Sequence, residues 1–425
     1  MNAIGGAFLG GASGRLLPAS VPLRFFGTAA ACHVLAWLAL ALAPGDWLQF
    51  AGGLGWPLAG LHLLTLGVFG MTALGAAAQL LPVATRQAPV GERALAAIWW
   101  FYSGGLALLA LGMGLARPSW LLAGGSAVGA ALAAWSLLVA RHLLGARGMP
   151  GVLMHAWGAL ASLLVLLASA LLLIAGWQGW PAPARAELLP LHLLFAPFGF
   201  MGLLVLGLSY ILVPMFTLAH PTPSERLQLA SGGLVMAGLL LGAAAVLMPD
   251  LALLRGAAWA AGSTGVLLHL VLMRRSITQG MRKSLGRSFV LLHLGWGALL
   301  LTLVLGGVLW AGVDDARLRA GFALALLAWL LSTVLGFMQR ILPFLAALHA
   351  AAGRRRGPTA SSLTHEPSLR VHFACHAAAF GLLALAVLLQ APLLARLAAV
   401  VGLAGAGAFA AFHVHLLRRL RAARN

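Results

Sequence analysis

Residues 61–83 read LHLLTLGVFGMTALGAAAQLLPV and carry no charged side chain. As a helix, these 23 residues would be about 34 Å long, which is sufficient to cross the roughly 30 Å hydrocarbon core of a lipid bilayer. The stretch lacks the two-residue alternation of a barrel strand, so a transmembrane helix is predicted. Similar runs recur along the chain and predict about twelve spans, at 24–44, 58–82, 94–116, 119–141, 151–176, 188–217, 227–248, 251–273, 288–312, 319–346, 368–390 and 393–417.

The composition assigns the whole chain, 1–425, to one transmembrane domain. Hydrophobic residues make up 62% of the 425 residues and charged residues only 8%, whereas a soluble domain carries about a quarter. Such a chain has too few polar groups to cover a globular surface, which excludes a soluble enzyme. Because lipid offers backbone groups no hydrogen-bond partner, an all-α, polytopic membrane protein is expected. Its 53 glycines are typical of close helix packing in lipid.

The basic residues predict the orientation of the chain. Of the 27 lysines and arginines, the predicted spans leave 21 on the side of the two chain ends and six on the other. Cytoplasmic loops carry the excess of lysine and arginine, so both termini are expected in the cytoplasm of a bacterium whose inner membrane holds the protein. The net charge of +19 is therefore topogenic, and the partner it indicates is the lipid bilayer and not nucleic acid. No cleavable signal peptide is expected, and 350–367 is predicted to be a cytoplasmic loop.

Three of the spans resemble one another. In the second, His62 precedes Pro82 by 20 residues, and in the sixth His192 precedes Pro214 by 22. The tenth ends at Pro343 and has a phenylalanine where the histidine would fall. These spacings predict three pseudo-repeated units of four helices.

Fourteen histidines against eight acidic residues suggest sites inside the bundle. Ionisable residues within spans usually face the protein interior, and a neutral imidazole is a ligand for haem iron, copper or zinc. His62 and His192 are predicted at similar depth near the outer face, where they are candidate cofactor ligands. The alternative is that each ring donates one hydrogen bond to a backbone carbonyl. Nine histidines form the predicted interior set: His33, His62, His155, His192, His269, His293, His372, His376 and His413.

A second candidate site is expected nearer the cytoplasmic side. His372 and His376 are four residues apart and share a helix face, with Cys375 beside them, and the first span contains the adjacent pair Cys32 and His33. If these spans are neighbours, the five side chains would form a copper or zinc site. The alternative is that the two cysteines pack as small hydrophobic residues.

Several functions are disfavoured by what the sequence lacks. None of the eight acidic residues falls within a predicted span, although proton pumps and ion-coupled carriers usually use intramembrane carboxylates. Neither a phosphate-binding loop, nor an HExxH motif, nor a CxxCH haem-attachment motif is found.

The predicted topology, the three units and the histidine of the second span resemble the catalytic subunit of haem–copper oxidases, including cbb3-type subunits and the NnrS family. The resemblance implies that His62 corresponds to the low-spin haem ligand and that His192 lies on the helix that supplies a copper ligand. It also implies two histidines in span 10 and a histidine pair in span 7, and this sequence has neither. The usual oxygen-reducing centre is therefore not expected.

The leading hypothesis is an oxidase-like membrane protein that binds haem b or copper and is neither an oxygen reductase nor a proton pump. Its expected role is in respiration-linked, nitric-oxide or metal physiology, with respiratory or assembly proteins as partners. One alternative is a small-solute transporter or channel with a histidine-lined path. The other is an accessory protein without a cofactor.

Overall fold

The computed structural model describes residues 15–43, 48, 50, 52–220, 224–313, 315–351 and 357–424. Within them, twelve helical spans are long and apolar enough to cross a membrane, which confirms the all-α, polytopic fold. Ten spans are single helices: α2 (Ser20–Leu42), α5 (Glu92–Gly114), α6 (Pro118–Leu144), α7 (Pro150–Trp177), α10 (Glu225–Leu247), α11 (Ala252–Gln279), α12 (Gly286–Trp310), α13 (Ala316–Ala351), α15 (Glu366–Leu389) and α16 (Pro392–Arg424).

The second and sixth spans are each interrupted by a π-helix. The second consists of α3 (Trp56–His62), η2 (Leu63–Gly70) and α4 (Met71–Thr85), and the sixth of α8 (Arg185–Leu194), η3 (Phe195–Gly202) and α9 (Leu203–Thr217). Such π-helical segments are rare and are frequently found at functional sites.

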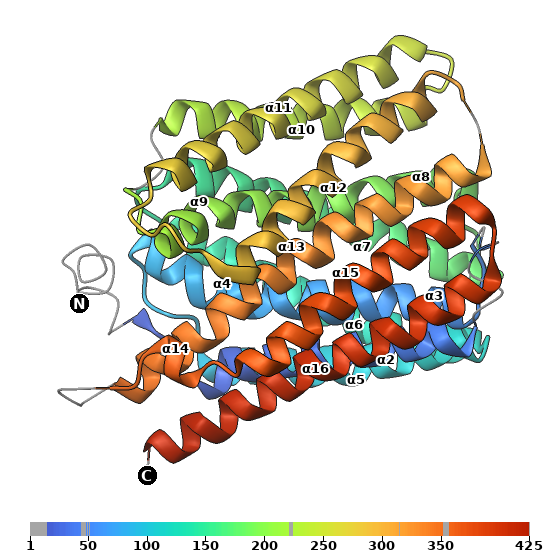
Figure 1. Cartoon of the computed structure of the whole chain (residues 1–425). Helices are drawn as coiled ribbons and strands as arrows, with labels where there is room; N and C mark the ends of the chain where they lie inside the picture. Colours follow the sequence, from blue (N-terminus) through green and yellow to red (C-terminus); the bar gives the residue numbers. More distant parts are fainter. Residues whose placement is uncertain are drawn as a thin grey trace.

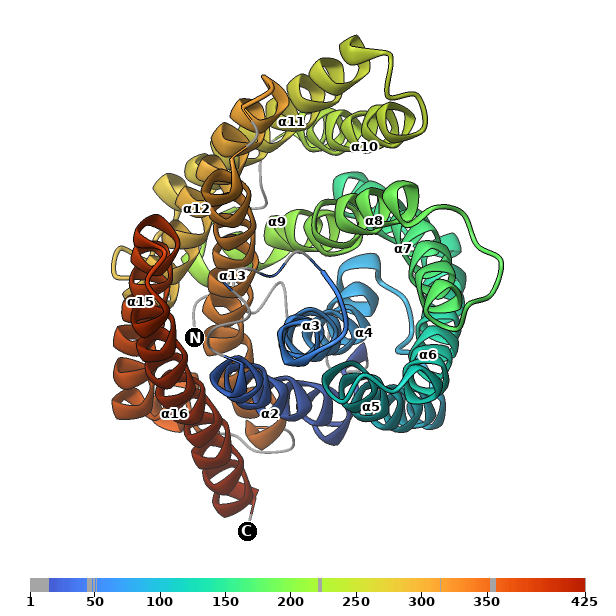
Figure 2. The same cartoon turned by 90° about the vertical axis from the view of Figure 1, so that its right-hand side faces the viewer.

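The interrupted spans and α13 lie at the centre of the bundle, and the other spans surround them (Figure 2). These three are the most deeply buried spans of the molecule. The Thr72 hydroxyl contacts the Met338 sulfur at 3.3 Å, which joins α4 to α13. The Phe198 ring stacks on Trp329 with 6.0 Å between centroids, which joins η3 to α13.

The two interrupted spans repeat each other closely. In both, an eight-residue π-helix precedes a 15-residue α-helix with proline at its twelfth position. Both then end at a left-handed residue, Arg86 or Leu218. Span 10 has no such interruption along α13, so the three-unit repeat stays a prediction. When the two spans are aligned on their π-helices, His62 corresponds to Leu194. His192 therefore lies two residues before the position that is equivalent to His62.

The chain enters α2 and leaves α16 at the same end of the bundle, on the left of Figure 1. At this end the predicted loop 350–367 is shorter than expected. Helix α13 extends to Ala351, α14 (Ala360–Leu363) forms one turn, and α15 begins at Glu366. Residues 352–356 lie outside the described part.

Candidate functional site

The structure brings His62 and His192 together. His62 is the last residue of α3, and His192 lies in the last turn of α8. Their ring centroids are 6.4 Å apart and the ring planes are inclined by 30°. The two histidines therefore lie at similar depth, as the sequence predicted, and form a pair between the second and sixth spans.

The hydrogen bonds of this pair leave nitrogen atoms free to act as ligands. His62 Nδ1 donates to the Leu58 carbonyl at 3.0 Å. A neutral imidazole that donates from Nδ1 keeps its lone pair on Nε2. His192 Nδ1 is buried and has no hydrogen-bond partner among the described residues. The alternative to metal binding is that each ring only donates one hydrogen bond to a backbone carbonyl. His62 makes such a bond but keeps Nε2 free, and His192 Nδ1 makes none among the described residues.

The spacing of the two rings is suitable for one metal ion between them. An ion bound by two opposed imidazoles holds the ring centres roughly 6.3 Å apart, because each metal–nitrogen bond is about 2.0–2.1 Å. The observed centroid distance of 6.4 Å is close to this value, with the two rings in a stacked contact. Metal-binding histidines usually donate their other ring N–H to a carbonyl or a carboxylate. The Leu58 carbonyl is such a partner for His62.

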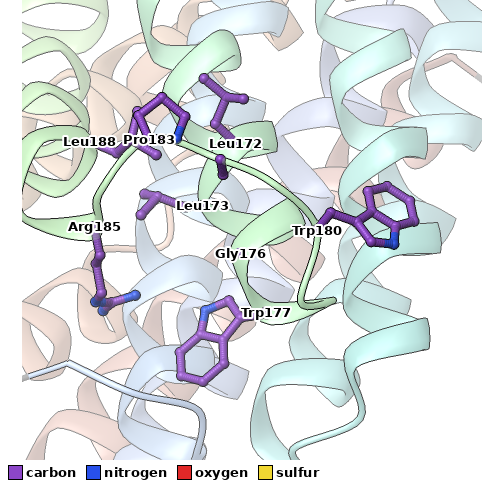
Figure 3. Close-up of a pocket in the computed structure, with 9 residues that line it drawn as sticks. Leu172, Leu173, Gly176, Trp177, Trp180, Pro183, Arg185 and Leu188 are labelled. Carbon is purple, nitrogen blue, oxygen red and sulfur yellow. The ribbon is translucent and has the colours of Figure 1, made fainter.

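A surface pocket lies next to the start of α8 (Figure 3). It has a volume of about 250 Å³ and is lined by Trp177, Trp180, Arg185 and Leu188, among others. The Arg185 guanidinium lies over the Trp177 ring, 5.5 Å from its centroid. Leu188 is one helical turn before His192, so the pocket shares a helix face with the histidine pair.

The second candidate site is brought together in part. The His33 and His372 ring centroids are 6.2 Å apart, and those of His372 and His376 are 5.7 Å apart. All three rings are buried and line one narrow internal gap, which is too small for a water-sized sphere. The gap is closed by Trp37 and by small residues of α16.

Each of these three imidazoles is held by a neighbouring polar side chain. His372 Nδ1 lies 3.1 Å from the Gln339 amide, and His376 Nε2 lies 2.9 Å from the Ser332 hydroxyl. Trp37 donates to His33 Nε2 at 3.1 Å. Because that nitrogen accepts, a neutral His33 carries its proton on Nδ1, which then cannot be a metal ligand. This side of the cluster is better suited to hydrogen bonding than to coordination.

The two cysteines do not join this cluster. Cys32 lies against η2, where a Cβ atom on Gly67 would be 2.8 Å from its sulfur. Cys375 lies against α16, where a Cβ atom on Gly405 would be 2.8 Å from its Cβ atom. In the described residues, no group of three or more histidine, cysteine, aspartate or glutamate side chains is placed to hold one ion. A metal at His33, His372 and His376 stays a prediction, with both thiols outside it.

A third cluster was not predicted as a site. His155 of α7 and His269 of α11 flank Tyr210 of α9, with ring centroids 5.5 and 5.0 Å from the tyrosine ring. Both histidines belong to the predicted interior set, which does not include Tyr210. The chain has only two tyrosines, so a buried one within a span was a signal in the sequence.

No protein-family model matches this chain, and no curated protein matches it.

Proposed function

We propose that this chain is an oxidase-like membrane protein that binds a transition metal, as haem b iron or as copper, between His62 and His192. The observation that supports it best is the 6.4 Å separation of the two rings, at the spacing of a shared metal ion. The free Nε2 of His62 and the unpartnered Nδ1 of His192 add to this support. The bound group would supply one-electron or gas-binding chemistry.

In this proposal the chain itself orients and encloses the metal. The Leu58 carbonyl fixes the His62 ring, and the two π-helices begin one to three residues after the histidines. The resemblance to haem–copper oxidases, including the cbb3-type and NnrS relatives, is part of the proposal. The twelve-helix architecture with three central spans supports it. Without carboxylates in the predicted spans, oxygen reduction coupled to proton pumping is not proposed.

The proposed location is the inner membrane of a bacterium, with both chain ends in the cytoplasm. The basic loops lie on that side, so the histidine pair would face the opposite side, where respiratory or assembly proteins would reach it. The proposed role is in respiration-linked, nitric-oxide or metal physiology.

The test is an optical spectrum together with elemental analysis of the purified full chain. We expect either a haem Soret band that is lost in His62→Ala and in His192→Ala, or a copper content that falls by one equivalent in each of these variants. His293→Ala is a matched control, because His293 Nδ1 also donates to the carbonyl four residues earlier, at 2.6 Å, but its ring contact is with Trp296 and not with a histidine. A folded wild-type protein that is colourless and metal-free overturns the proposal.

The interruption of two central spans favours transport as the second candidate function. Broken helices at the centre of a bundle are typical of substrate sites in transporters. Uptake of small solutes by proteoliposomes, lost in His62→Ala with metal content unchanged, would support it.

A further inference from the structure

The cluster of His155, Tyr210 and His269 lies far from the histidine pair. Tyr210 follows His192 by 18 residues on the same span, which corresponds to about 27 Å along a helix. His155 lies in the second turn of α7, and His269 lies ten residues before the end of α11. The cluster is therefore in the half of the bundle that contains the chain ends.

These three side chains are among the most deeply buried polar groups of the molecule. His155 and His269 have 0% exposure and Tyr210 has 2%. Glycines make room for the His155 ring on two helices. A Cβ atom on Gly207 would be 2.6 Å from the His155 Cβ atom, and one on Gly232 would be 2.7 Å from its Cε1 atom. Small residues of α9 and α10 thus form a fitted space for this imidazole.

The hydrogen bonds of the cluster are incomplete. His155 Nδ1 donates to the Gly151 carbonyl at 2.7 Å, so Nε2 keeps the lone pair. That atom has no partner within the part of the chain that the structure describes. Neither ring nitrogen of His269 has a partner in the described residues. The Tyr210 hydroxyl lies near Ser231, whose own hydroxyl donates to the Gly265 carbonyl at 2.8 Å.

Hydrogen bonds within the cluster do not satisfy these groups. Two neutral imidazoles present two lone pairs, and the free donors are the Tyr210 hydroxyl and the one N–H of His269. Among the described residues, none of these groups is hydrogen-bonded to another member of the cluster. A buried polar group without a partner is unfavourable. Protonation of a ring would require a nearby anion, and none of the chain's acidic residues falls within a predicted span. A Lewis acid, in contrast, accepts both lone pairs and the phenol oxygen at once.

The geometry points to a second metal site, in which His155 Nε2, Tyr210 Oη and one nitrogen of His269 bind a first-row divalent transition-metal ion such as Cu²⁺. A phenolate and an imidazole that share an ion have ring centres roughly 5–7 Å apart, and the observed separations are 5.5 and 5.0 Å. Imidazole nitrogen suits copper and zinc. On binding, the Tyr210 oxygen forms the metal–oxygen bond, its O–H bond breaks, and one proton is released. The phenolate then offsets one of the two positive charges.

Copper titration of the purified, chelator-treated full chain tests this site. The His62→Ala/His192→Ala background removes the proposed outer site, so the two proposals can fail separately. In this background we expect one equivalent of Cu²⁺ and a visible phenolate-to-copper charge-transfer band. Tyr210→Phe, which removes a single oxygen atom, is expected to abolish the band, and His269→Ala is expected to lose the bound ion.

The control in the same background is His293→Ala, which is expected to keep both the ion and the band. Size-exclusion profiles and thermal unfolding confirm that each variant is folded. The proposal is wrong if no copper binds in the background protein. It is equally wrong if Tyr210→Phe keeps the band, or if His269→Ala keeps the ion, since the bound copper would then have other ligands.

Discussion

His62 and Leu194 occupy the same structural position, because each is the last residue before a π-helix. His192 stands two residues earlier, which is about 200° around a helix. Nevertheless its ring meets that of His62 at 6.4 Å. The histidine pair therefore depends on non-equivalent positions in two similar spans.

Moving the histidine from position 192 to position 194, which is equivalent to that of His62, is expected not to restore metal binding. His192→Leu should lose the outer metal, and His192→Leu/Leu194→His should not regain it. The Leu194 side chain points toward α10, where a Cβ atom on Gly242 would be 3.0 Å from it. Metal content and the absorption spectrum of both variants check this. Recovery in the double variant would show that the site tolerates either position.

Two adjacent glycines of α5 are expected to respond differently to substitution. A Cβ atom on Gly105 would lie 2.8 Å from that of Ala127 and 2.9 Å from the Val128 nitrogen. One on Gly104 would meet no described atom within 4 Å. Gly105→Ala should lower the free energy of unfolding by about 1–3 kcal/mol, because α5 and α6 must separate. Gly104→Ala should leave it unchanged or slightly raised. Thermal unfolding in detergent measures both, and equal effects would contradict the packing.

The segment before α15 is expected to loosen in acid. The His365 and His415 rings stack with 4.0 Å between centroids. Arg419 donates to the Ser362 and Thr364 carbonyls. The pKa of His365, which lies outside the spans, is lowered by partial burial and by positive charge on His415 and Arg419. The folded state therefore disfavours protonation of His365. The stability of this segment is highest above the usual histidine pKa of about 6.5 and decreases as the pH falls below that value.

Hydrogen exchange of residues 357–365, corrected for its intrinsic pH dependence, measures this effect. Protection should be greater at pH 7.5 than at pH 5. His365→Asn should flatten the difference, while Arg419 keeps its carbonyl contacts. A pH step of the same size in His365→Asn would rule out this titration as its cause.

The cysteines are expected to be dispensable for metal binding. Cys32 and Cys375 contact different helices and lie outside the gap that the three histidines line. Cys32→Ala/Cys375→Ala should keep the wild-type metal stoichiometry, measured by elemental analysis. A loss of metal in the folded double variant would restore the thiols as ligands.

The twelve spans were predictable because bilayer thickness and the cost of buried charge fix the length and composition of each. The match of depth between His62 and His192 was predictable from their distances to the helix ends. The sequence analysis places the thiols in the second site, whereas adjacent residues differ by about 100° around a helix, so Cys32 and His33 lie on different faces.

Two other features required the structure. The π-helices arise from a change in backbone hydrogen bonding that the apolar sequences of η2 and η3 do not reveal. The cluster around Tyr210 joins α7, α9 and α11, and no local spacing connects these helices. Its two histidines were identified as buried, but their tyrosine partner was not.

The neutrality of the buried imidazoles also determines how the protein responds to a transmembrane voltage. Moving one elementary charge through 100 mV involves about 2.3 kcal/mol, but an uncharged ring experiences no such force. His33, His155 and His269 lie deep in the bundle without a neighbouring acid to stabilise a proton. The energised state of the membrane would therefore exert no direct force on these rings, and would act at their sites only through ions that enter them.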